Sequence, residues 1–312
     1  MAGSGFGTNF RITTWGETHG AGVGVVVDGC PAGLPLERED VQKYLDRRKP
    51  GQSKYTTQRK EGDQVEILSG IFEGRTTGTP ISMVVYNKDQ RSKDYSNIKD
   101  IYRPGHADFT FDMKYGFRDY RGGGRSSGRE TIGRVAAGAV AAKVLKELGI
   151  EIKAYAKAIA GIEVSKDHFD FAEMNNNPFN MPDKEAAKLV QEKADQMIKE
   201  MDSIGGIIEC QITGMPVGIG ETVFDKLDAE LSKAIMSIGS VKGFEIGDGF
   251  EAANLRGSEN NDDFICVDGK VEKETNHSGG VLGGMSDGSA IVFRAAIKPT
   301  PSIAQTQKDC DV

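Results

Sequence analysis

The residues with the clearest chemical potential lie in an arginine- and glycine-rich segment, residues 118–134. It reads R-D-Y-R-G-G-G-R-S-S-G-R-E-T-I-G-R and contains five arginines and five glycines. Glycines let backbone N–H groups approach a ligand closely, a helix start supplies unpaired N–H donors, and arginine adds planar forks that suit phosphate or carboxylate. We therefore predict a site for phosphorylated or carboxylated small molecules.

Two of the four histidines stand in turn-forming surroundings. His19 lies in G-E-T-H-G and His106 in R-P-G-H-A-D. Because the pKa of histidine suits neutral pH, we predict acid–base roles for both. The alternative for any lone histidine is a surface or hydrogen-bonded core position, and we expect His168 at the surface.

Further basic residues flank rigid turns. Arg47, Arg48 and Lys49 precede Pro50 and Gly51, and Arg103 precedes another Pro-Gly pair. Consecutive basic residues usually form a solvated face, which is the alternative here. Their position beside turns favours a part in the predicted anion site.

The charge distribution argues against a nucleic-acid-binding protein. The chain carries a net charge of −7, made up of +4 over residues 1–134 and −11 over the rest. Nucleic-acid binding usually needs a broad basic face, whereas clustered arginines in an acidic chain suit a small anion. The alternative of an RNA-binding module rests on the single Arg-Gly-Gly sequence at Arg121, which precedes a strong helical pattern.

Several classes of site and location lose support. The four cysteines are far apart without a C-x-x-C motif, so we expect neither zinc nor disulfides and place the protein in a reducing cytoplasm. We expect no signal peptide and no membrane span. The motifs of Rossmann, P-loop and zincin sites are missing from the sequence.

Two sequence patterns recur in the same order. A strand at residues 23–27 followed by G-C-P-A-G and a helix at 39–48 resembles a strand at 209–212 followed by G-M-P-V-G and a helix at 225–238. A second pair begins at Gly74 and Gly284 and leads into strands at 82–85 and 292–296. Although G-x-P-x-G is a common turn, the two matches together predict an internal duplication with pseudo-twofold symmetry.

Two further helices are predicted from composition and periodicity. Residues 131–148 are rich in alanine and end at Gly149, and residues 183–202 follow Pro182. In the second helix we expect a buried stripe. It comprises Ala186, Leu189, Val190, Met197, Ile198 and Met201.

Six long motifs, taken in order, resemble the chorismate synthase family. They are G-E-T-H-G-A-G-V-G-V-V-V-D-G-C-P-A-G, D-R-R-K-P-G-Q-S, D-Y-S-N-I-K-D-I-Y-R-P-G-H-A-D, Y-G-F-R-D-Y-R-G-G-G-R-S-S-G-R-E-T, N-H-S-G-G-V-L-G-G and I-K-P-T-P-S-I. The resemblance covers nearly the whole chain. It implies a single domain over residues 1–312 with an α/β fold, a β-α-β sandwich of antiparallel sheets with helices between them and an internal pseudo-twofold repeat.

The resemblance also implies an activity and its requirements. The reaction would be the 1,4-anti elimination of phosphate from 5-enolpyruvylshikimate 3-phosphate to give chorismate. It would need reduced FMN, although the reaction brings no net redox change. An external reductase would reduce the flavin, so NADPH would be involved only indirectly. The expected assembly is a homotetramer in the cytoplasm, with neither nucleic acid nor membrane as a partner.

Site residues carry over motif by motif. His19 resembles the histidine that protonates the departing phosphate, and His106 resembles the histidine beside the flavin. The implied substrate-binding residues are Arg48, Lys54, Arg103 and Arg129. The implied cofactor-binding residues are Arg125, Ser126, Ser127, Gly239, Ser240, Gly283, Lys298, Pro299, Thr300, Pro301 and Ser302.

Some positions depart from the family pattern. Lys54 replaces a frequent arginine and so keeps the charge but loses the fork, Thr18 replaces a serine, and Pro301 replaces a frequent serine. The family's later R-H-D-P-C segment is missing. We expect that the sequence is truncated, and the alternative is a catalytically impaired member that binds FMN or anions without turnover.

Overall fold

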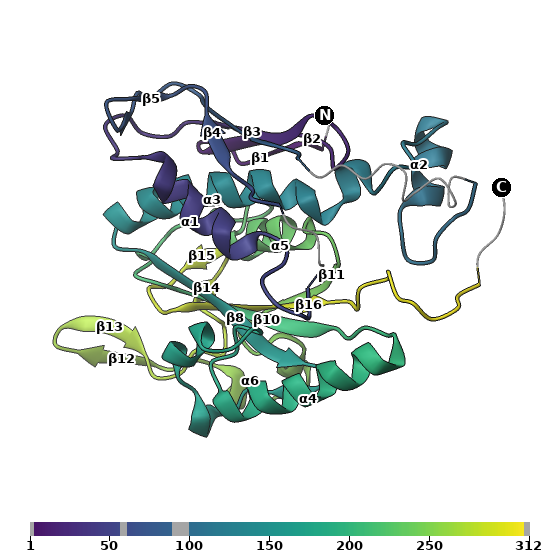
Figure 1. The fold of residues 1–312 in the computed structure, drawn as a ribbon. Coiled ribbons are helices and arrows are strands. Elements are labelled where there is room, and N and C mark those ends of the chain that lie inside the picture. Colours follow the sequence, from purple (N-terminus) through teal and green to yellow (C-terminus); the bar gives the residue numbers. More distant parts are fainter. Residues whose placement is uncertain (1–2, 57–60, 89–99, 309–312) are drawn as a thin grey trace. The chain divides into compact units, whose positions relative to one another are not determined.

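Two five-stranded antiparallel sheets organise the chain, one in each of two units (Figure 1). Unit 1 comprises Met1–Leu145 and Thr306–Val312, and unit 2 comprises Lys146–Gln305. The structure, a computed structural model, describes residues 3–56, 61–88 and 100–308.

The sheet of unit 1 has the order β1-β2-β3-β7-β4. Its strands are β1 (Gly5–Phe6), β2 (Arg11–Gly16), β3 (Gly22–Asp28), β7 (Ile81–Tyr86) and β4 (Val65–Ile67). The helices are α1 (Arg38–Arg48), α2 (Asp108–Tyr115) and α3 (Thr131–Glu147), and β5 (Ile71–Phe72) and β6 (Arg75–Thr76) form a small hairpin. Two short 3-10 turns, η2 (Gly124–Ser126) and η3 (Gly128–Glu130), lead into α3.

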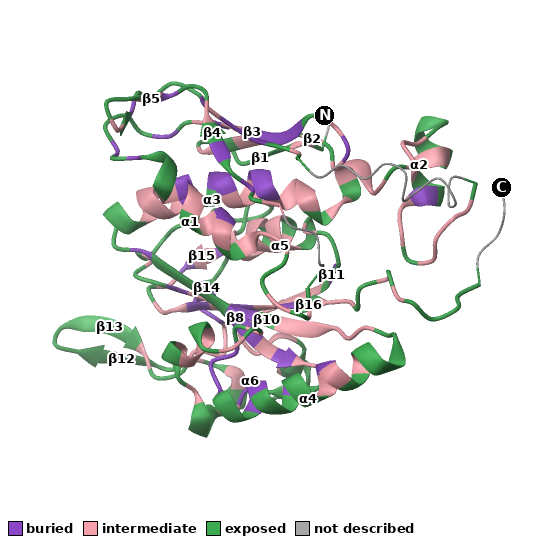
Figure 2. Cartoon of the chain, in the orientation of Figure 1, coloured by how far each residue is buried: buried purple, intermediate pink, exposed green. Residues whose placement is uncertain are grey.

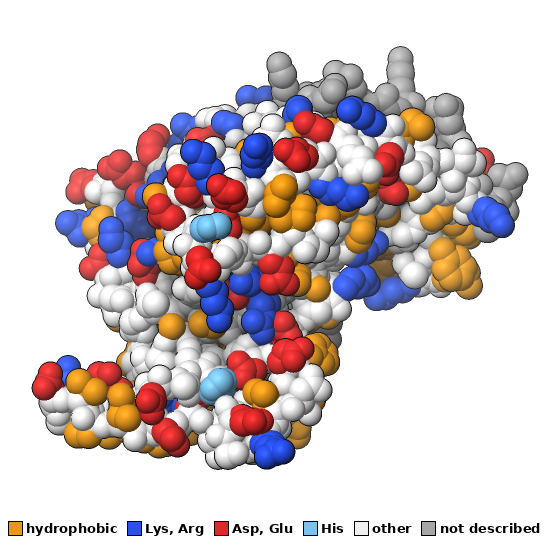
Figure 3. Space-filling model, turned by 90° about the horizontal axis from the view of Figure 1, so that it is seen from below, with side chains coloured by type: hydrophobic (Ala, Val, Ile, Leu, Met, Phe, Trp, Pro, Cys, Tyr) orange, Lys and Arg blue, Asp and Glu red, His pale blue; other side chains and the backbone are white. Residues whose placement is uncertain are grey.

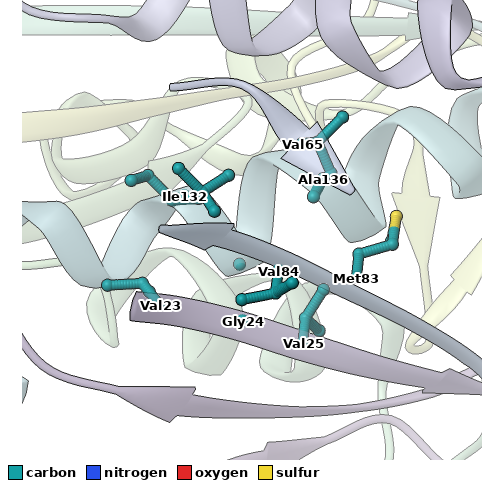
Figure 4. A pocket seen from close by; sticks show the side chains of 10 residues that line it. Val23, Gly24, Val25, Val65, Met83, Val84, Ile132 and Ala136 are labelled. Atoms are coloured by element: carbon teal, nitrogen blue, oxygen red, sulfur yellow. The ribbon is translucent and has the colours of Figure 1, made fainter. Parts of the chain in front are cut away.

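The core of unit 1 forms where α1 and α3 cover one face of the sheet (Figure 2). β3 is rich in valine, and Val23, Val25 and Val27 are buried on this face, as are Ala136 and Val140 of α3. Alanine and glycine residues on α3 let the helix approach the strands closely, and a Cβ at Gly133 would lie 3.0 Å from the Gly24 carbonyl oxygen. Figure 4 shows the resulting gap between α3 and the sheet, which is lined by apolar residues and has no space for a water molecule. This gap belongs to the core and is not a ligand site.

The sheet of unit 2 has the order β11-β16-β10-β8-β9. Its strands are β11 (Val241–Ile246), β16 (Ile291–Ile297), β10 (Gly206–Thr213), β8 (Glu151–Ile159) and β9 (Ile162–Glu163). The helices α4 (Lys184–Glu200) and α5 (Leu227–Met236) lie on opposite faces of this sheet (Figure 1). The remaining elements are η4 (Lys166–His168), η5 (Phe171–Asn175), η6 (Gly249–Asn254), α6 (Gly257–Asn260) and the hairpins β12–β13 (Phe264–Val267, Lys270–Lys273) and β14–β15 (Val281–Leu282, Met285–Ser286).

The predicted helices at 131–148 and 183–202 are confirmed as α3 and α4, but the predicted buried stripe of α4 is partly wrong. Its buried residues are Ala186, Ala187, Val190 and Ala194, whereas the side chains of Leu189, Ile198 and Met201 are more than half exposed. The alanines bring the helix close to the sheet, so the buried face is centred on small residues. The larger apolar residues at its margins remain in solvent.

The two units repeat one another, as the sequence echoes predict. In unit 1 the order strand, turn, helix, strand, hairpin, strand runs from β3 to β7, and in unit 2 it runs from β10 to β16. The pairings agree, because β7 lies between β3 and β4 just as β16 lies between β10 and β11. The duplication therefore extends to the sheet topology.

The repeat extends to individual hydrogen bonds. The Thr76 hydroxyl donates to the Pro31 carbonyl at 2.6 Å and accepts from the Leu34 N–H. The Ser286 hydroxyl donates to the Pro216 carbonyl at 2.5 Å and accepts from the Ile219 N–H. Each hydroxyl is buried and ties the G-x-P-x-G turn to the following hairpin, which explains why both echoes occur together.

Candidate active site

His19 lies in the turn between β2 and β3 and is only 7 % exposed. Gly122 covers its ring: a Cβ atom built on Gly122 would lie 2.9 Å from Cδ2 and 3.1 Å from Nε2. The backbone of Gly122 has a φ of +149°, which side chains of other residues rarely tolerate. Two segments separated by about a hundred residues in sequence therefore meet at this histidine.

Asn87, directly after β7, connects the histidine turn to the arginine-rich segment. Its side-chain amide donates to the Glu17 carbonyl at 2.9 Å and to the Gly20 carbonyl at 2.8 Å. Its Oδ1 accepts from Nε of Arg129 at 2.6 Å. A single amide thus fixes both the turn that carries His19 and one predicted substrate arginine.

Arg129 and a second predicted substrate arginine, Arg48, meet at one buried carboxylate. Asp63 accepts from Nη1 of Arg48 at 2.7 Å through Oδ2 and from Nη1 of Arg129 at 3.0 Å through Oδ1. The Asp63 side chain is completely buried. Nη2 of Arg129, itself buried, makes no hydrogen bond to a residue that the structure describes, although Oε2 of Glu61 lies 3.7 Å away.

The charge state of this cluster follows from its surroundings. Burial lowers the pKa of Arg48, and the charge of Arg129 acts in the same direction, while Asp63 opposes both. Arginine still remains protonated in proteins because its ordinary pKa is so high. The cluster therefore holds two cations and at least one anion in a partly buried place, which suits recognition of an anionic group.

In the predicted flavin-binding triplet, Arg125 and Ser127 are half-buried and Ser126 is exposed. Arg125 donates to the carbonyls of Thr14 and Gly16, both at 3.1 Å, and to the Thr14 hydroxyl at 2.7 Å. Ser126 donates to the Gly123 carbonyl at 2.6 Å, and Ser127 accepts from the N–H of Arg129 at 3.3 Å. These side chains shape the glycine-rich loop and attach it to β2.

Arg103 and His106 form a second cluster in front of α2. Arg103 makes a bidentate pair with the buried carboxylate of Asp108, at 2.7 and 2.8 Å. Burial alone would raise the pKa of Asp108, but its hydrogen bonds and ion pair with Arg103 keep that pKa below its ordinary value. Nδ1 of His106 lies 2.9 Å from the Pro104 carbonyl.

The remaining basic residues of the predicted site have separate positions. Lys54 is exposed in the loop after α1, with Nζ 5.0 Å from the centre of the Tyr55 ring. Arg118 bonds the Ile101 carbonyl and Asp112, Arg121 pairs with Asp119, and Arg134 pairs with Glu130 one helical turn away. Several arginines of residues 118–134 therefore brace the segment itself.

In unit 2, most predicted cofactor residues gather at one corner of the sheet. The N–H of Lys298 donates to the Ser240 carbonyl at 2.9 Å, and the Thr300 carbonyl accepts from the Ser203 hydroxyl at 2.7 Å. Gly239 and Ser240 follow α5, and Ser240 has a φ of +73°. Gly283 lies elsewhere, next to Gly284. The Gly284 carbonyl accepts a hydrogen bond from the N–H of Leu227, the first residue of α5, so this position is at the opposite end of that helix from Gly239.

The donor set at this corner fits a flavin phosphate. It combines a lysine with hydroxyls of Ser240, Thr300 and Ser302, and a Cβ at Gly239 would meet only open space. Exposed hydroxyls, a cation and an uncovered backbone are groups that bind phosphate and ribityl oxygens. Within unit 1, the side chains of residues 125–127 already bond to the loop and to β2, so this triplet offers mainly its backbone to a ligand.

Sequence reasoning missed the carboxylates and the amide that hold these groups. Asp63, Asp108 and Asn87 fell outside the predicted set, although each pairs with an arginine inside it. For Asp108 a signal was available, since it lies five residues after Arg103. Asp63 and Asn87 are remote from Arg129 in sequence, so only the fold reveals them.

On the face in Figure 3, basic and acidic side chains are intermixed without a broad basic area. Within the described ranges 3–56, 61–88 and 100–308, the helices are too short or too polar to cross a membrane.

Known proteins resemble this chain along almost its whole length. The family model described as chorismate synthase matches residues 10–312. Chorismate synthases of Lachnospira eligens and Agathobacter rectalis are 70 % and 66 % identical over 99 % and 98 % of this chain, each match covering 84 % of the relative.

The fold agrees with a solved structure. A crystal structure of chorismate synthase superimposes with a TM-score of 0.80 and 33 % identity, covering 94 % of this chain and 85 % of that one. The mixed α/β fold with antiparallel sheets predicted from the motifs is thereby confirmed. On both the family match and the level of identity, the chain belongs to the chorismate synthase family.

Proposed function

We propose that this chain catalyses the 1,4-anti elimination of phosphate from 5-enolpyruvylshikimate 3-phosphate, giving chorismate. The substrate carries one phosphate and two carboxylates, and the reaction removes a ring hydrogen and the allylic phosphate. The observation that carries the proposal is the convergence of Arg48 and Arg129 beside the turn that holds His19. Guanidinium forks bind both phosphate and carboxylate, so this group matches the substrate's anions.

His19 is suited to protonate the departing phosphate. Its ring is nearly buried against Gly122, which limits competing exchange with water. The adjoining arginines stabilise negative charge on the leaving group as the C–O bond breaks. Proton transfer and charge stabilisation would thus act on the same oxygen atoms.

The imidazole of His106 is oriented by a hydrogen bond at one ring nitrogen. Because a carbonyl oxygen can only accept, Nδ1 of His106 donates its hydrogen to the Pro104 carbonyl. We assign the acid–base role predicted for a histidine beside the flavin to Nε2, the other ring nitrogen. The hydrogen bond also fixes the orientation of the ring.

When bound, reduced FMN would supply transient electron density for the elimination, without net redox change. In unit 2 the predicted contact residues are Gly239, Ser240 and Lys298–Ser302, and in unit 1 they are residues 125–127. Gly283 stays a predicted contact residue. The protein's own contribution is to orient the substrate, exclude water and supply protons.

The remaining proposals concern assembly and location. We propose a cytoplasmic homotetramer, by analogy with the family. Flavin would be reduced by an external reductase, with NADPH acting only through that enzyme. These features rest on the family resemblance.

An anaerobic assay tests the reaction. The full-length protein is incubated with chemically reduced FMN and 5-enolpyruvylshikimate 3-phosphate, and released phosphate and chorismate are measured. Equimolar formation of both supports the proposal, and omission of the flavin should abolish it. A folded full-length protein that binds FMN but forms no chorismate would instead support the impaired-member alternative.

A further inference from the structure

One buried carboxylate, that of Asp63, contacts both Arg48 and Arg129. Asp63 has a side-chain exposure of 0 %, against 22 % and 11 % for the two arginines. Each carboxylate oxygen of Asp63 accepts a hydrogen bond from one arginine. The two oxygens therefore set the spacing of the two guanidinium groups. The carboxylate therefore lies beneath the arginines rather than in the ligand's place.

The backbone at Asp63 is held in an unusual conformation. Its φ is +43°, in the left-handed region that aspartate and asparagine tolerate better than most residues. Gln42 of α1 fixes this conformation from both sides, since its amide donates to the Asp63 carbonyl at 3.2 Å and its Oε1 accepts from the Val65 N–H at 3.0 Å. The position of the carboxylate is thus determined by α1 and β4.

We propose that Asp63 is a positioning residue that sets the geometry and the net charge of the Arg48–Arg129 pair for the substrate. This inference rests on the proposed function, because it assigns those arginines to the substrate's anionic groups. Asp63 offsets the charge of one of the two guanidinium groups, and Glu61, 3.7 Å from Nη2 of Arg129, adds a second carboxylate. The pair then binds a ligand whose anions match its spacing in preference to any small anion.

The proposal predicts opposite changes for substrate and for free phosphate. In Asp63→Asn the amide keeps the shape and the tolerance for positive φ but loses the charge and one acceptor oxygen. The arginines lose their common anchor, so KM for 5-enolpyruvylshikimate 3-phosphate should rise about tenfold or more. Inhibition by inorganic phosphate should strengthen severalfold, because the site gains one net positive charge.

A merely structural role gives a different result. Loss of local order would weaken substrate and phosphate binding together and lower kcat in parallel. Parallel weakening, or values of KM and of the phosphate inhibition constant within twofold of the wild type, would overturn the proposal. The matched control is Asp28→Asn, which breaks an exposed Arg11–Asp28 pair at 3.0 Å on β2 and β3 and should change neither constant.

A second variant keeps the test open if Asp63→Asn does not fold. Asp63→Glu retains the charge but displaces it by one methylene, so KM should rise while inhibition by phosphate stays as in the wild type. An unchanged KM in this variant would overturn the proposal. If the wild-type protein itself releases no phosphate from the substrate, the proposed function fails, and calorimetric titration of wild type and Asp63→Asn with inorganic phosphate still tests the role of Asp63.

Discussion

Gly122 and His19 are in such close contact that the glycine position has no room for a methyl group. The predicted consequence of Gly122→Ala is displacement of the imidazole, with kcat falling about tenfold or more because a small misplacement of a catalytic group is costly. The measurement is steady-state turnover under anaerobic conditions. Gly128→Ala in the same loop is the control, since a Cβ there meets nothing within 4 Å. Equal activity of the two variants would remove His19 from its assigned role.

His106→Ala should impair turnover much more than substrate binding. A proton donor acts mainly in the transition state, so kcat should fall about a hundredfold or more while KM changes little. His106→Gln helps to separate chemistry from packing, because it retains a polar side chain without the titratable ring. Equal losses in kcat and in substrate affinity would contradict the assignment.

Arg125 should contribute more to stability than its predicted role in flavin binding suggests. Its hydrogen bonds to Thr14 and Gly16 join the glycine-rich loop to β2. Arg125→Met should lower the free energy of unfolding by about 2 kcal/mol, since it leaves the carbonyls of buried Thr14 and half-buried Gly16 without a charged donor. Urea unfolding measures this, with the helix-surface pair variant Arg134→Ala as the control. Wild-type stability combined with lost FMN affinity would show that Arg125 acts on the cofactor alone.

Because of Asp183, the free energy of unfolding of unit 2 should depend on pH in the acid range. Burial alone would raise the pKa of this carboxyl, but hydrogen bonds from the N–H groups of Ala186, Ser165 and Glu185 outweigh it and lower the pKa. The stabilisation is therefore complete above the unfolded-state pKa of about 3.9 and is lost as pH falls through the lower folded-state value.

Asp183→Asn tests this dependence. The amide can still cap α4, so the variant should lose only part of the cap's roughly 1 kcal/mol at pH 7 and should unfold with a weaker dependence on pH below about 4. Unfolding by urea at pH 7 and pH 3 compares the two proteins. Identical acid profiles would show that other carboxylates dominate.

The sequence predicts those parts of the fold that depend on local pattern. The alanine-rich helix ends at Glu147 with Gly149 beyond it, and the recurring G-x-P-x-G turns do mark a duplicated unit. These succeed because capping, turn geometry and periodicity act over a few residues. The predicted buried stripe of α4 is partly wrong because the buried face of the helix is the one that can lie closest to the sheet. Alanines allow the closest approach, so the face that carries them is buried.

The site is predicted less completely, for a physical reason. Arginines and histidines are recognisable by type and by neighbouring glycines, whereas Asp63 lies in an ordinary stretch of sequence and acquires its importance from the residues that the fold brings to it. The same holds for Asn87, whose amide joins three separate segments. Partners of this kind require the long-range pairing of β4, β7 and β3 to be known.

Trp15 provides the chain with an intrinsic fluorescent probe. It is the only tryptophan of the chain, and its ring lies across Gly24, where a Cβ would come within 2.3 Å of Cζ2. Indole fluorescence therefore originates at one fixed place, next to Gly16 and four residues before His19. Since flavin absorbs where indole emits, occupancy of a nearby flavin would be visible as quenching of a single emitter, without any added label.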